Sequence, residues 1–146
     1  MSGGPRLVAC DLDGTLLGSD GRVSRPVRKA VERALDAGIW VIAVTGRPWQ
    51  WTLDIARAHR LLPVSVVSNG AAILEVESGE VRPTGLADGA VLGLMERIRA
   101  RVPGVTFAVD GVHRMGHEPG FHDDTYFGGH DVHVGDLSEL VASDVV

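Results

Sequence analysis

The stretch LVACDLDGTLL, residues 7–17, places two acidic side chains directly after a short apolar run. Residues 7–10 are all apolar, as in a strand that is buried on both faces of a parallel sheet. Asp11 and Asp13 follow one residue apart, and Gly14 lets the backbone turn sharply. Two neighbouring carboxylates repel each other, and strands disfavour aspartate, so this arrangement costs stability. We interpret it as a site for a cation or for an anionic reaction centre.

Two further apolar runs also end in polar motifs that contain glycine. Residues 39–44 are apolar and end at the motif TGR, residues 45–47. Residues 64–67 form a second such run, which ends at the motif SNG, residues 68–70. Both runs have the length and composition of buried strands. The sequence therefore predicts three strands that each end in a candidate binding motif.

Two predicted helices separate these three strands. Ser24 has the character of a helix N-cap with Pro26 in the first turn, and Gly38 ends that helix. Pro48 opens a second helical stretch that reaches about His59. Strands that alternate with helices form a parallel sheet with right-handed crossovers, and ligands bind beyond the carboxyl ends of such strands. We therefore expect an α/β fold in which the three motifs meet at one edge of the sheet.

The pattern changes after Gly70. Residues 71–76 and 80–83 read as a hairpin, which adds antiparallel strands to the sheet. A helix is then predicted, followed by a strand over residues 105–109. One face of this helix would carry Val91, Leu94, Met95, Ile98 and Val102. We expect a boundary near Pro83, with one module over residues 1–83 and a second over residues 84–146.

Composition limits the class of protein and the kind of partner. The chain has 146 residues, 45% of them hydrophobic, and a net charge of -5. It contains no run of clustered Lys and Arg, which argues against nucleic acid as a partner. It also lacks an apolar stretch near the roughly 18 residues of a membrane helix, and its N-terminus does not resemble a secretory signal. Cys10 is the only cysteine, which agrees with a reducing compartment. These features together predict a cytoplasmic protein with a small molecule as its partner.

The residue types at the three strand ends suit phosphoryl transfer. A carboxylate can attack phosphorus when a divalent cation neutralises the phosphate, which forms an aspartyl-phosphate. A second carboxyl group can protonate the leaving oxygen and later activate water. Thr45 and Gly46 offer a hydroxyl and an open backbone N–H to phosphate oxygens, and Asn69 and Gly70 offer an amide and another flexible backbone.

The three motifs in this order resemble the haloacid dehalogenase (HAD) superfamily. DLDGTLL, TGR and SNGA carry the resemblance, and SNGA with the hairpin is similar to the Cof-type sugar-phosphate phosphatases of subfamily IIB. The resemblance spans roughly residues 7–83, and the rest is similar to the beginning of an α/β (C2-type) cap. It implies a Rossmann-like core with a parallel sheet over residues 1–83 and part of a cap over residues 84–146.

The resemblance also implies a role for each motif residue. Asp11 would be the nucleophile and a Mg²⁺ ligand, and Asp13 the general acid and base whose backbone carbonyl also reaches Mg²⁺. Thr45 would bind phosphate through its hydroxyl, with Arg47 and Asn69 as further contributors and Gly46 and Gly70 as backbone donors. The implied function is Mg²⁺-dependent hydrolysis of a small phosphorylated metabolite such as a sugar phosphate.

The sequence also departs from the family pattern. Members need a lysine beside the nucleophile and a final acidic motif of the form GDxxxD, but the single lysine here, Lys29, lies in the first predicted helix. Gly135-Asp136 resembles the acidic motif, yet we expect Asp136 to cap a helix that runs through Leu140. The chain is thus expected to stop within the cap. An unfinished sheet edge then predicts self-association.

Other interpretations remain open for the chain and for its motifs. The chain could be a phosphomutase, or an incomplete fragment with a binding role only. Asp11 and Asp13 could simply cap a loop, Thr45 could cap the helix before Pro48, Arg47 could pair with an acid, and Asn69-Gly70 is an ordinary turn signal. A group of histidines and aspartates invites a metal site, but the spacing matches no standard pattern, so we expect loop residues. This group comprises His113, His117, His122, Asp123, Asp124, His130, Asp131 and His133.

Overall fold

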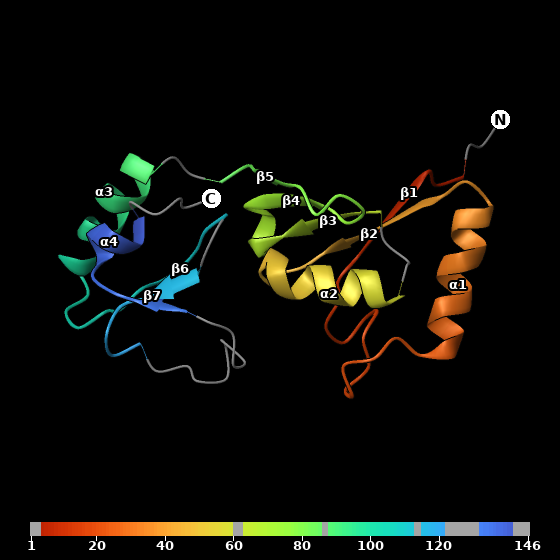
Figure 1. Cartoon of the computed structure of the whole chain (residues 1–146), viewed down its shortest axis with the longest axis horizontal. Helices are drawn as coiled ribbons and strands as arrows, with labels where there is room; N and C mark the ends of the chain where they lie inside the picture. The colour runs from red at the N-terminus through yellow and green to blue at the C-terminus, as the bar shows by residue number, and fades with distance from the viewer. Residues whose placement is uncertain (1–3, 60–62, 86–87, 113–114, 122–131, 142–146) are drawn as a thin grey trace. The chain divides into compact units, whose positions relative to one another are not determined.

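The computed structural model describes residues 4–59, 63–85, 88–112, 115–121 and 132–141. The chain divides into two compact units, residues 1–84 and 85–146 (Figure 1). Each unit has its own sheet, and the two are described separately below.

The first unit is built on a five-stranded sheet with the order β1-β2-β3-β4-β5. The first three strands are parallel, and β4 and β5 are antiparallel to their neighbours. This confirms the predicted α/β class, in which a parallel sheet is extended by a hairpin. The strands are β1 (Leu7–Cys10), β2 (Trp40–Val44), β3 (Val64–Val67), β4 (Ala72–Glu75) and β5 (Val81–Pro83).

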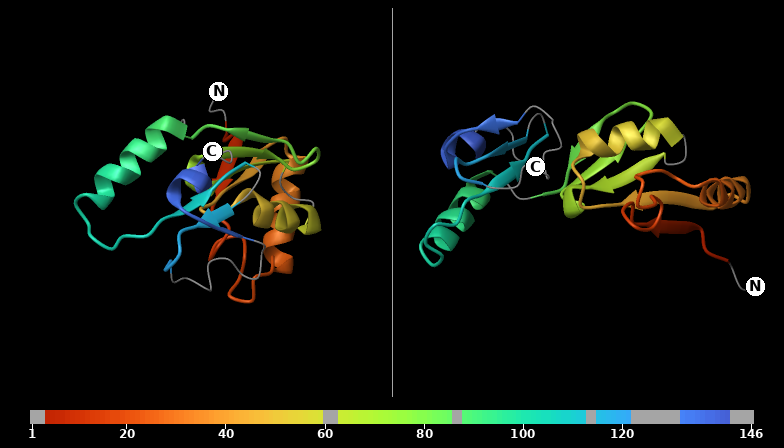
Figure 2. Two further views of the ribbon diagram at one scale, coloured as in Figure 1. Left: turned by 60° about the vertical axis from the view of Figure 1, so that its left-hand side comes forward. Right: turned by 90° about the horizontal axis from the view of Figure 1, so that it is seen from below.

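Helices α1 (Arg25–Asp36) and α2 (Trp49–His59) connect the parallel strands. The Ser24 hydroxyl accepts the N–H of Val27 at 3.5 Å, which confirms the predicted N-cap of α1. Helix α1 contacts β2, whereas α2 contacts β3 and β4, as the views in Figure 2 let the reader follow. Right-handed crossovers between neighbouring strands place both helices on the same face of the sheet.

Burial differs sharply between the two faces of this sheet. The face that the helices cover is buried at every position of β2, β3 and β4, namely Val41, Ala43, Ser65, Val67, Ala72 and Leu74. On the opposite face Leu7 is 52% exposed and Trp40 is 55% exposed. The expectation that β1 and β2 are buried on both faces is therefore wrong. The physical reason is that, in the part of the chain that the structure describes, β1 ends the sheet and both helices lie on the other face.

The second unit packs two helices against a small sheet. Helix α3 (Asp88–Arg99) is followed by β6 (Ala108–Asp110), β7 (Met115–His117), β8 (His133–Val134) and α4 (Leu137–Val141). Strand β7 lies in the middle, antiparallel to β6 and parallel to β8. The buried core consists of Met95, Leu137 and Val141, against which Val91, Leu92, Phe107 and Val109 pack.

Two expectations for this unit need correction. The strand predicted over residues 105–109 is shorter and lies later, because Val105 N–H bonds to Val102 in a turn and Phe107 N–H donates to the Glu118 carboxylate at 3.1 Å. Helix α3 ends at Arg99, so Val102 lies beyond it and is 51% exposed. Leu94 is exposed as well. Its place in the core is taken by Leu92, which the helical pattern did not select.

None of the helices within the described ranges is long and apolar enough to cross a membrane.

Candidate functional site

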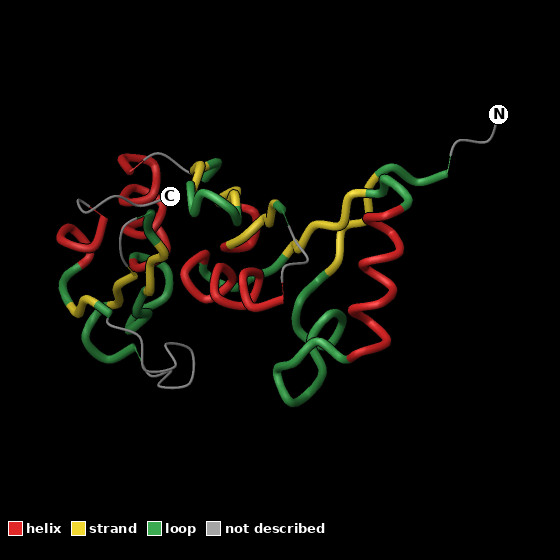
Figure 3. Tube along the Cα trace, turned by 45° about the vertical axis from the view of Figure 1, so that its right-hand side comes forward, coloured by secondary structure: helices red, strands yellow, loops and turns green. Residues whose placement is uncertain are grey.

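The loop after β1 presents both aspartates to solvent. Leu12 lies between Asp11 and Asp13 and is 1% exposed, whereas both acids are exposed. Leu17 N–H bonds to the Leu12 carbonyl at 2.8 Å, and Leu16 N–H bonds to the Asp11 carbonyl at 3.3 Å. This loop is part of the green stretch between β1 and α1 in Figure 3. Burial of Leu12, Leu16 and Leu17 thus anchors the loop and leaves the carboxylates at the strand end.

Thr45 follows β2 and is almost fully buried. Its N–H donates to the Val66 carbonyl at 2.9 Å, and its hydroxyl oxygen accepts the N–H of Arg47 at 3.1 Å. Helix α2 begins only at Trp49, so this bond lies before the helix and differs from the helix cap that we weighed as an alternative. The hydroxyl proton of Thr45 remains able to donate to an anion.

The loop after β3 adopts an unusual backbone conformation. Ser68, Asn69 and Gly70 have consecutive positive φ angles of 53°, 55° and 95°. Positive φ is uncommon outside glycine, and such strain persists where the surroundings hold it in place. Here Ser68 N–H donates to the Arg47 carbonyl at 2.9 Å, and Asn69 N–H donates to the Thr45 carbonyl at 3.2 Å. The motif is therefore tied to the loop after β2.

Gly46 and Asn69 lie in direct contact. A Cβ atom on Gly46 would sit 2.8 Å from the Asn69 Oδ1 atom. Contacts this short do not occur between real side chains, so only glycine fits at position 46 while Asn69 keeps its place. The structure thus brings TGR and SNG together, as the motif order predicted.

Arg47 connects the loops after β1 and β2. Its Nε and Nη2 atoms donate to the two carboxylate oxygens of Asp13 at 2.8 and 2.7 Å. This hydrogen-bonded pair holds the pKa of Asp13 below its usual value and raises the pKa of Arg47. Because both side chains are partly exposed, the pair is worth about 1 kcal/mol or less. The structure thus confirms that Arg47 pairs with an acid, which was the alternative to a role in phosphate binding.

Asp11 has a different environment. Its Oδ1 atom accepts the N–H of Leu12 at 2.8 Å. No ion pair to Asp11 occurs among residues 4–59, 63–85, 88–112, 115–121 and 132–141. The surroundings of the two neighbouring acids therefore differ: Asp13 is paired with Arg47, while the Asp11 side chain is exposed at the end of β1.

The donor atoms at this edge suit a hard divalent cation. Mg²⁺ prefers oxygen ligands and is often bound through one or two carboxylates, with water and substrate phosphate completing its shell. Asp11 supplies one such carboxylate at the surface, whereas both oxygens of the Asp13 carboxylate accept bonds from Arg47. The described part of the chain holds no group of three or more His, Cys, Asp or Glu residues that could bind a metal ion. The residues present fit a Mg²⁺ ion that is shared with a phosphate.

Asp136 has a structural role in the second unit. Its Oδ1 atom accepts the N–H of Glu139 at 3.0 Å and the hydroxyl of Ser138 at 2.6 Å, and Glu139 accepts the N–H of Asp136 in return. These bonds lower the pKa of Asp136 and form a capping box at the start of α4. The prediction that Asp136 caps a helix through Leu140 is confirmed.

Only two members of the histidine and aspartate group lie within the described residues. His117 bonds through Nδ1 to the Glu118 carbonyl at 2.9 Å, and its ring contacts Phe121. His133 lies in β8 next to Gly135. The other members, His113, His122, Asp123, Asp124, His130 and Asp131, lie outside the described residues.

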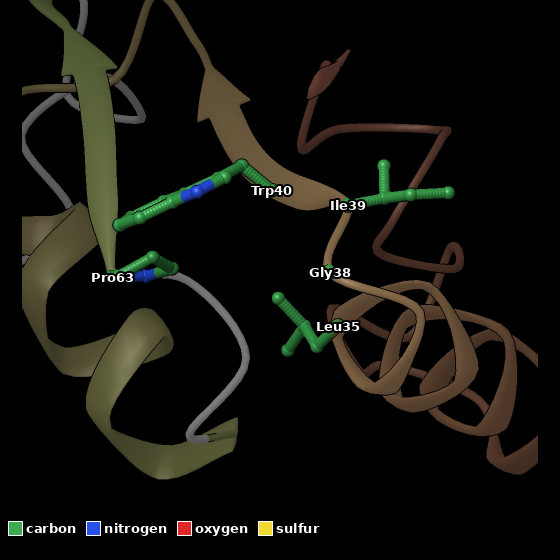
Figure 4. Close-up of a pocket in the computed structure, with 5 residues that line it drawn as sticks. All are labelled: Leu35, Gly38, Ile39, Trp40 and Pro63. Carbon is green, nitrogen blue, oxygen red and sulfur yellow. The ribbon is translucent and has the colours of Figure 1, made fainter. Parts of the chain in front are cut away.

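Two hollows in the first unit lie away from the three motifs. One, of about 210 Å³, is lined by Leu35, Gly38, Ile39, Trp40 and Pro63 (Figure 4). It opens where β2 and β3 begin, and the one polar side-chain atom among these five residues is the indole nitrogen of Trp40, so the lining offers no nucleophile or acid for phosphoryl chemistry. The second is lined by Arg25, Pro26, Lys29 and Arg33 of α1. The single lysine of the chain therefore belongs to the exposed surface of this helix.

Some contacts of the site were not predicted from sequence. The Thr84 hydroxyl donates to the Gly70 carbonyl at 2.7 Å and so holds the third motif from the far end of the hairpin. No motif includes Thr84, because the contact depends on the β4–β5 register that brings residue 84 back to residue 71. The proximity of Gly46 and Asn69 followed from the shared sheet edge, but their direct contact did not.

The chain matches a known family of hydrolases over most of its length. The family model of haloacid dehalogenase-like hydrolases matches residues 8–112. Among curated proteins, the 5-amino-6-(5-phospho-D-ribitylamino)uracil phosphatase YcsE of Bacillus subtilis (strain 168) is 35% identical over 68 residues. That match covers 47% of this chain and 27% of YcsE.

Solved structures share the fold over almost the whole chain. TM0651 from Thermotoga maritima matches with a TM-score of 0.69 and 23% identity, covering 97% of this chain and 54% of that one. The HAD subclass IIB sugar phosphatase BT4131 matches with a TM-score of 0.72 and 18% identity, covering 97% of this chain and 56% of that one. The chain thus spans about half the length of these structures, and identity this low shows the fold alone.

Proposed function

Because the chain belongs to the family of haloacid dehalogenase-like hydrolases, we propose that it hydrolyses phosphomonoesters through an aspartyl-phosphate on Asp11. One observation carries the proposal. In the part of the chain that the structure describes, the two acids are held differently: Asp13 accepts two bonds from Arg47, and Asp11 accepts the N–H of Leu12. An exposed carboxylate suits a nucleophile, and a second carboxylate beside it suits a proton carrier.

The proposed reaction has two halves. In the first, an Asp11 oxygen attacks phosphorus, the bond to the leaving alcohol breaks, and that alcohol oxygen takes a proton from Asp13. In the second, the Asp13 carboxylate takes a proton from water, the resulting hydroxide attacks phosphorus, and inorganic phosphate leaves Asp11. Thr45 and the backbone beside Gly46 and Asn69 would hold the phosphate oxygens.

A Mg²⁺ ion held by the Asp11 carboxylate and the Asp13 backbone carbonyl would neutralise the phosphate charge, and the Asp13 carboxyl group would remain able to carry a proton. Arg47 would then exchange partners. Its bond to Asp13 holds that group as a carboxylate, which suits the second half of the reaction. For the first half Asp13 must carry a proton, so Arg47 would turn from Asp13 to the incoming phosphate.

The relatives and structural neighbours also support a substrate class and a role for each of the two units. Phosphatase names among the relatives and the sugar phosphatase among the structural neighbours support a small phosphorylated metabolite such as a sugar phosphate. Residues 1–84 would form the N-terminal part of the family core, and residues 85–146 part of the cap.

The test is release of inorganic phosphate from an aryl phosphate by the purified chain, with and without Mg²⁺. The proposal predicts turnover that depends on Mg²⁺ and falls to background in Asp11→Asn. Asp54→Asn is the matched control, because Asp54 is an exposed acid on α2 away from the motifs. Phosphorus NMR of the products distinguishes phosphate release from the isomerisation that a phosphomutase would catalyse.

A binding role without turnover is the second candidate. The observation in its favour is that no cation pairs with Asp11 in the residues that the structure describes. A folded chain without turnover, whose Gly46 and Asn69 amide signals shift on addition of inorganic phosphate, would support this role and overturn the hydrolase proposal.

A further inference from the structure

The SNG motif, residues 68–70, depends on anchors from outside its own sequence. Its three consecutive positive φ angles include two residues other than glycine, Ser68 and Asn69. Such a backbone persists only where the surrounding structure holds it in place. Two anchors come from the loop after β2, where the carbonyls of Arg47 and Thr45 accept the N–H groups of Ser68 and Asn69. These two bonds fix the first half of the motif.

Thr84 holds the second half of the motif. Its hydroxyl donates to the Gly70 carbonyl at 2.7 Å, and its N–H donates to the Ala71 carbonyl at 2.8 Å. Gly70 has a φ of 95° and no side chain, so its own structure restricts the turning of its peptide group less than any other residue would. One residue, 14 positions further along the chain, thus orients two successive peptide groups.

The two bonds from Thr84 have different origins. The N–H bond continues the pairing of β4 with β5, in which Ala72 is in register with Pro83, and any residue at position 84 except proline can form it. The hydroxyl bond needs a short side chain with a donor, as in threonine or serine. The pairing of the strands therefore does not require the bond to the Gly70 carbonyl, which depends on the side chain at position 84.

The hydroxyl bond lies at the surface, since Thr84 and Gly70 are both exposed. Water can take the place of an exposed donor, so the loss of this bond costs the folded chain little stability. It does leave the Gly70 backbone free to turn, and the peptide group that joins Gly70 to Asn69 can then move. The loss of the hydroxyl is thus expected to change the geometry of the motif more than the stability of the fold.

On the basis of the phosphate site proposed above, we infer that Thr84 is a positioning residue for that site. Its hydroxyl fixes the Gly70 backbone and so keeps Asn69 against Gly46, where both backbones would hold phosphate oxygens. Thr84 acts through these residues and does not itself touch the phosphate.

Two substitutions at position 84 separate the hydroxyl from the rest of the residue. Thr84→Val keeps the shape of the side chain and the N–H bond to Ala71, whereas Thr84→Ser keeps the hydroxyl as well. Ser78→Ala is the matched control, because it removes a hydroxyl from the opposite end of the same hairpin, where Ser78 bonds to Glu75 and Glu80. Urea unfolding checks that every variant is folded, and its midpoint should change little in Thr84→Val.

Amide hydrogen exchange of the full chain without ligand is the first measurement. The N–H groups of Ser68 and Asn69 bond to the loop after β2 and do not contact Thr84 directly. Their exchange should be faster in Thr84→Val and close to that of wild type in Thr84→Ser and Ser78→Ala. Unchanged exchange in a folded Thr84→Val chain would overturn the proposal, whether or not the chain binds phosphate.

Titration of the same chains with inorganic phosphate in the presence of Mg²⁺ is the second measurement, followed at the amide signal of Gly46. Thr84→Val should weaken phosphate binding roughly three- to tenfold, which corresponds to the net worth of one hydrogen bond. Thr84→Ser should restore the affinity, and Ser78→Ala should not change it. Equal affinity in wild type and Thr84→Val would overturn the role of Thr84 and leave the phosphate site standing. A wild-type chain that binds no phosphate would overturn the site itself, and with it the role of Thr84.

Discussion

Single side chains decide the chemistry at the carboxyl ends of the strands. Asp11 and Asp13 are only one residue apart, yet burial of Leu12 between them and the reach of Arg47 make their surroundings different. Local sequence placed both acids at the end of β1. The difference between their surroundings depends on Arg47, which is 34 residues away from Asp13 in the chain.

The first prediction concerns the pKa of Asp13. Replacing Arg47 by Gln removes the hydrogen-bonded guanidinium and should return the lowered pKa of Asp13 toward its usual value of about 4. Titration of the Asp13 carboxyl carbon by NMR measures this shift. An unchanged pKa in Arg47→Gln would show that the pair is absent in solution.

The same pair has a defined effect on stability. A carboxyl group with a lowered pKa in the folded state stabilises the protein above the pKa of the unfolded state, and this contribution is lost as pH falls through the folded pKa. The difference in unfolding free energy between wild type and Arg47→Gln should be at most about 1 kcal/mol at neutral pH. Urea unfolding at neutral pH and below about pH 3 measures this difference, which should become smaller in acid.

A second prediction follows from the contact of Gly46 with Asn69. Gly46→Ala forces Cβ against Oδ1 and should destabilise the chain by roughly 1–3 kcal/mol. In an Asn69→Gly background the obstructing amide is gone, so the same substitution should cost less. Urea unfolding of the four chains of this double-mutant cycle measures the coupling. Additive effects would contradict the contact.

Helices and strands of the second unit depend on close approach at Gly116. A Cβ atom there would clash with the Leu140 Cδ2 atom and would lie 3.0 Å from the His133 carbonyl oxygen, so α4 and β8 leave no room for it. The unit is small, and its packing is further held by Glu118, which is 7% exposed and pairs with Arg99.

Two glycine substitutions in this unit should therefore have opposite effects. Gly116→Ala is expected to destabilise the unit by about 1–3 kcal/mol through overpacking. Gly93→Ala adds a methyl group to open space inside α3, where alanine favours the helix by about 1 kcal/mol. Thermal unfolding of both variants measures whether each substitution lowers or raises the stability of the unit. Equal effects would contradict the packing of α4 against β7.

The surface of the first unit as a whole is uneven. One face of its sheet is buried under two helices, and the other exposes apolar side chains over β1 and β2. Sequence reasoning assigned burial to both faces, because an uninterrupted apolar run does not show which faces find a partner. That depends on the strand order and on the side to which the crossovers turn.

Tryptophan fluorescence provides a test of this open face. Trp40 is 55% exposed, whereas Trp49 and Trp51 are each partly buried. Trp40→Phe should therefore remove the component of emission that iodide quenches most readily. Equal quenching in wild type and Trp40→Phe would show that the face is covered in solution.

The sequence by itself determined the α/β class, the three strand ends and the family to which they point. It could do so because strands, helix caps and turns are each indicated by a pattern of contiguous residues. Tertiary structure alone decided the pairing of Arg47 with Asp13, the contact of Asn69 with Gly46 and the open face beside β1. Each of these depends on distances between segments that are far apart in the chain, and no local pattern specifies such distances.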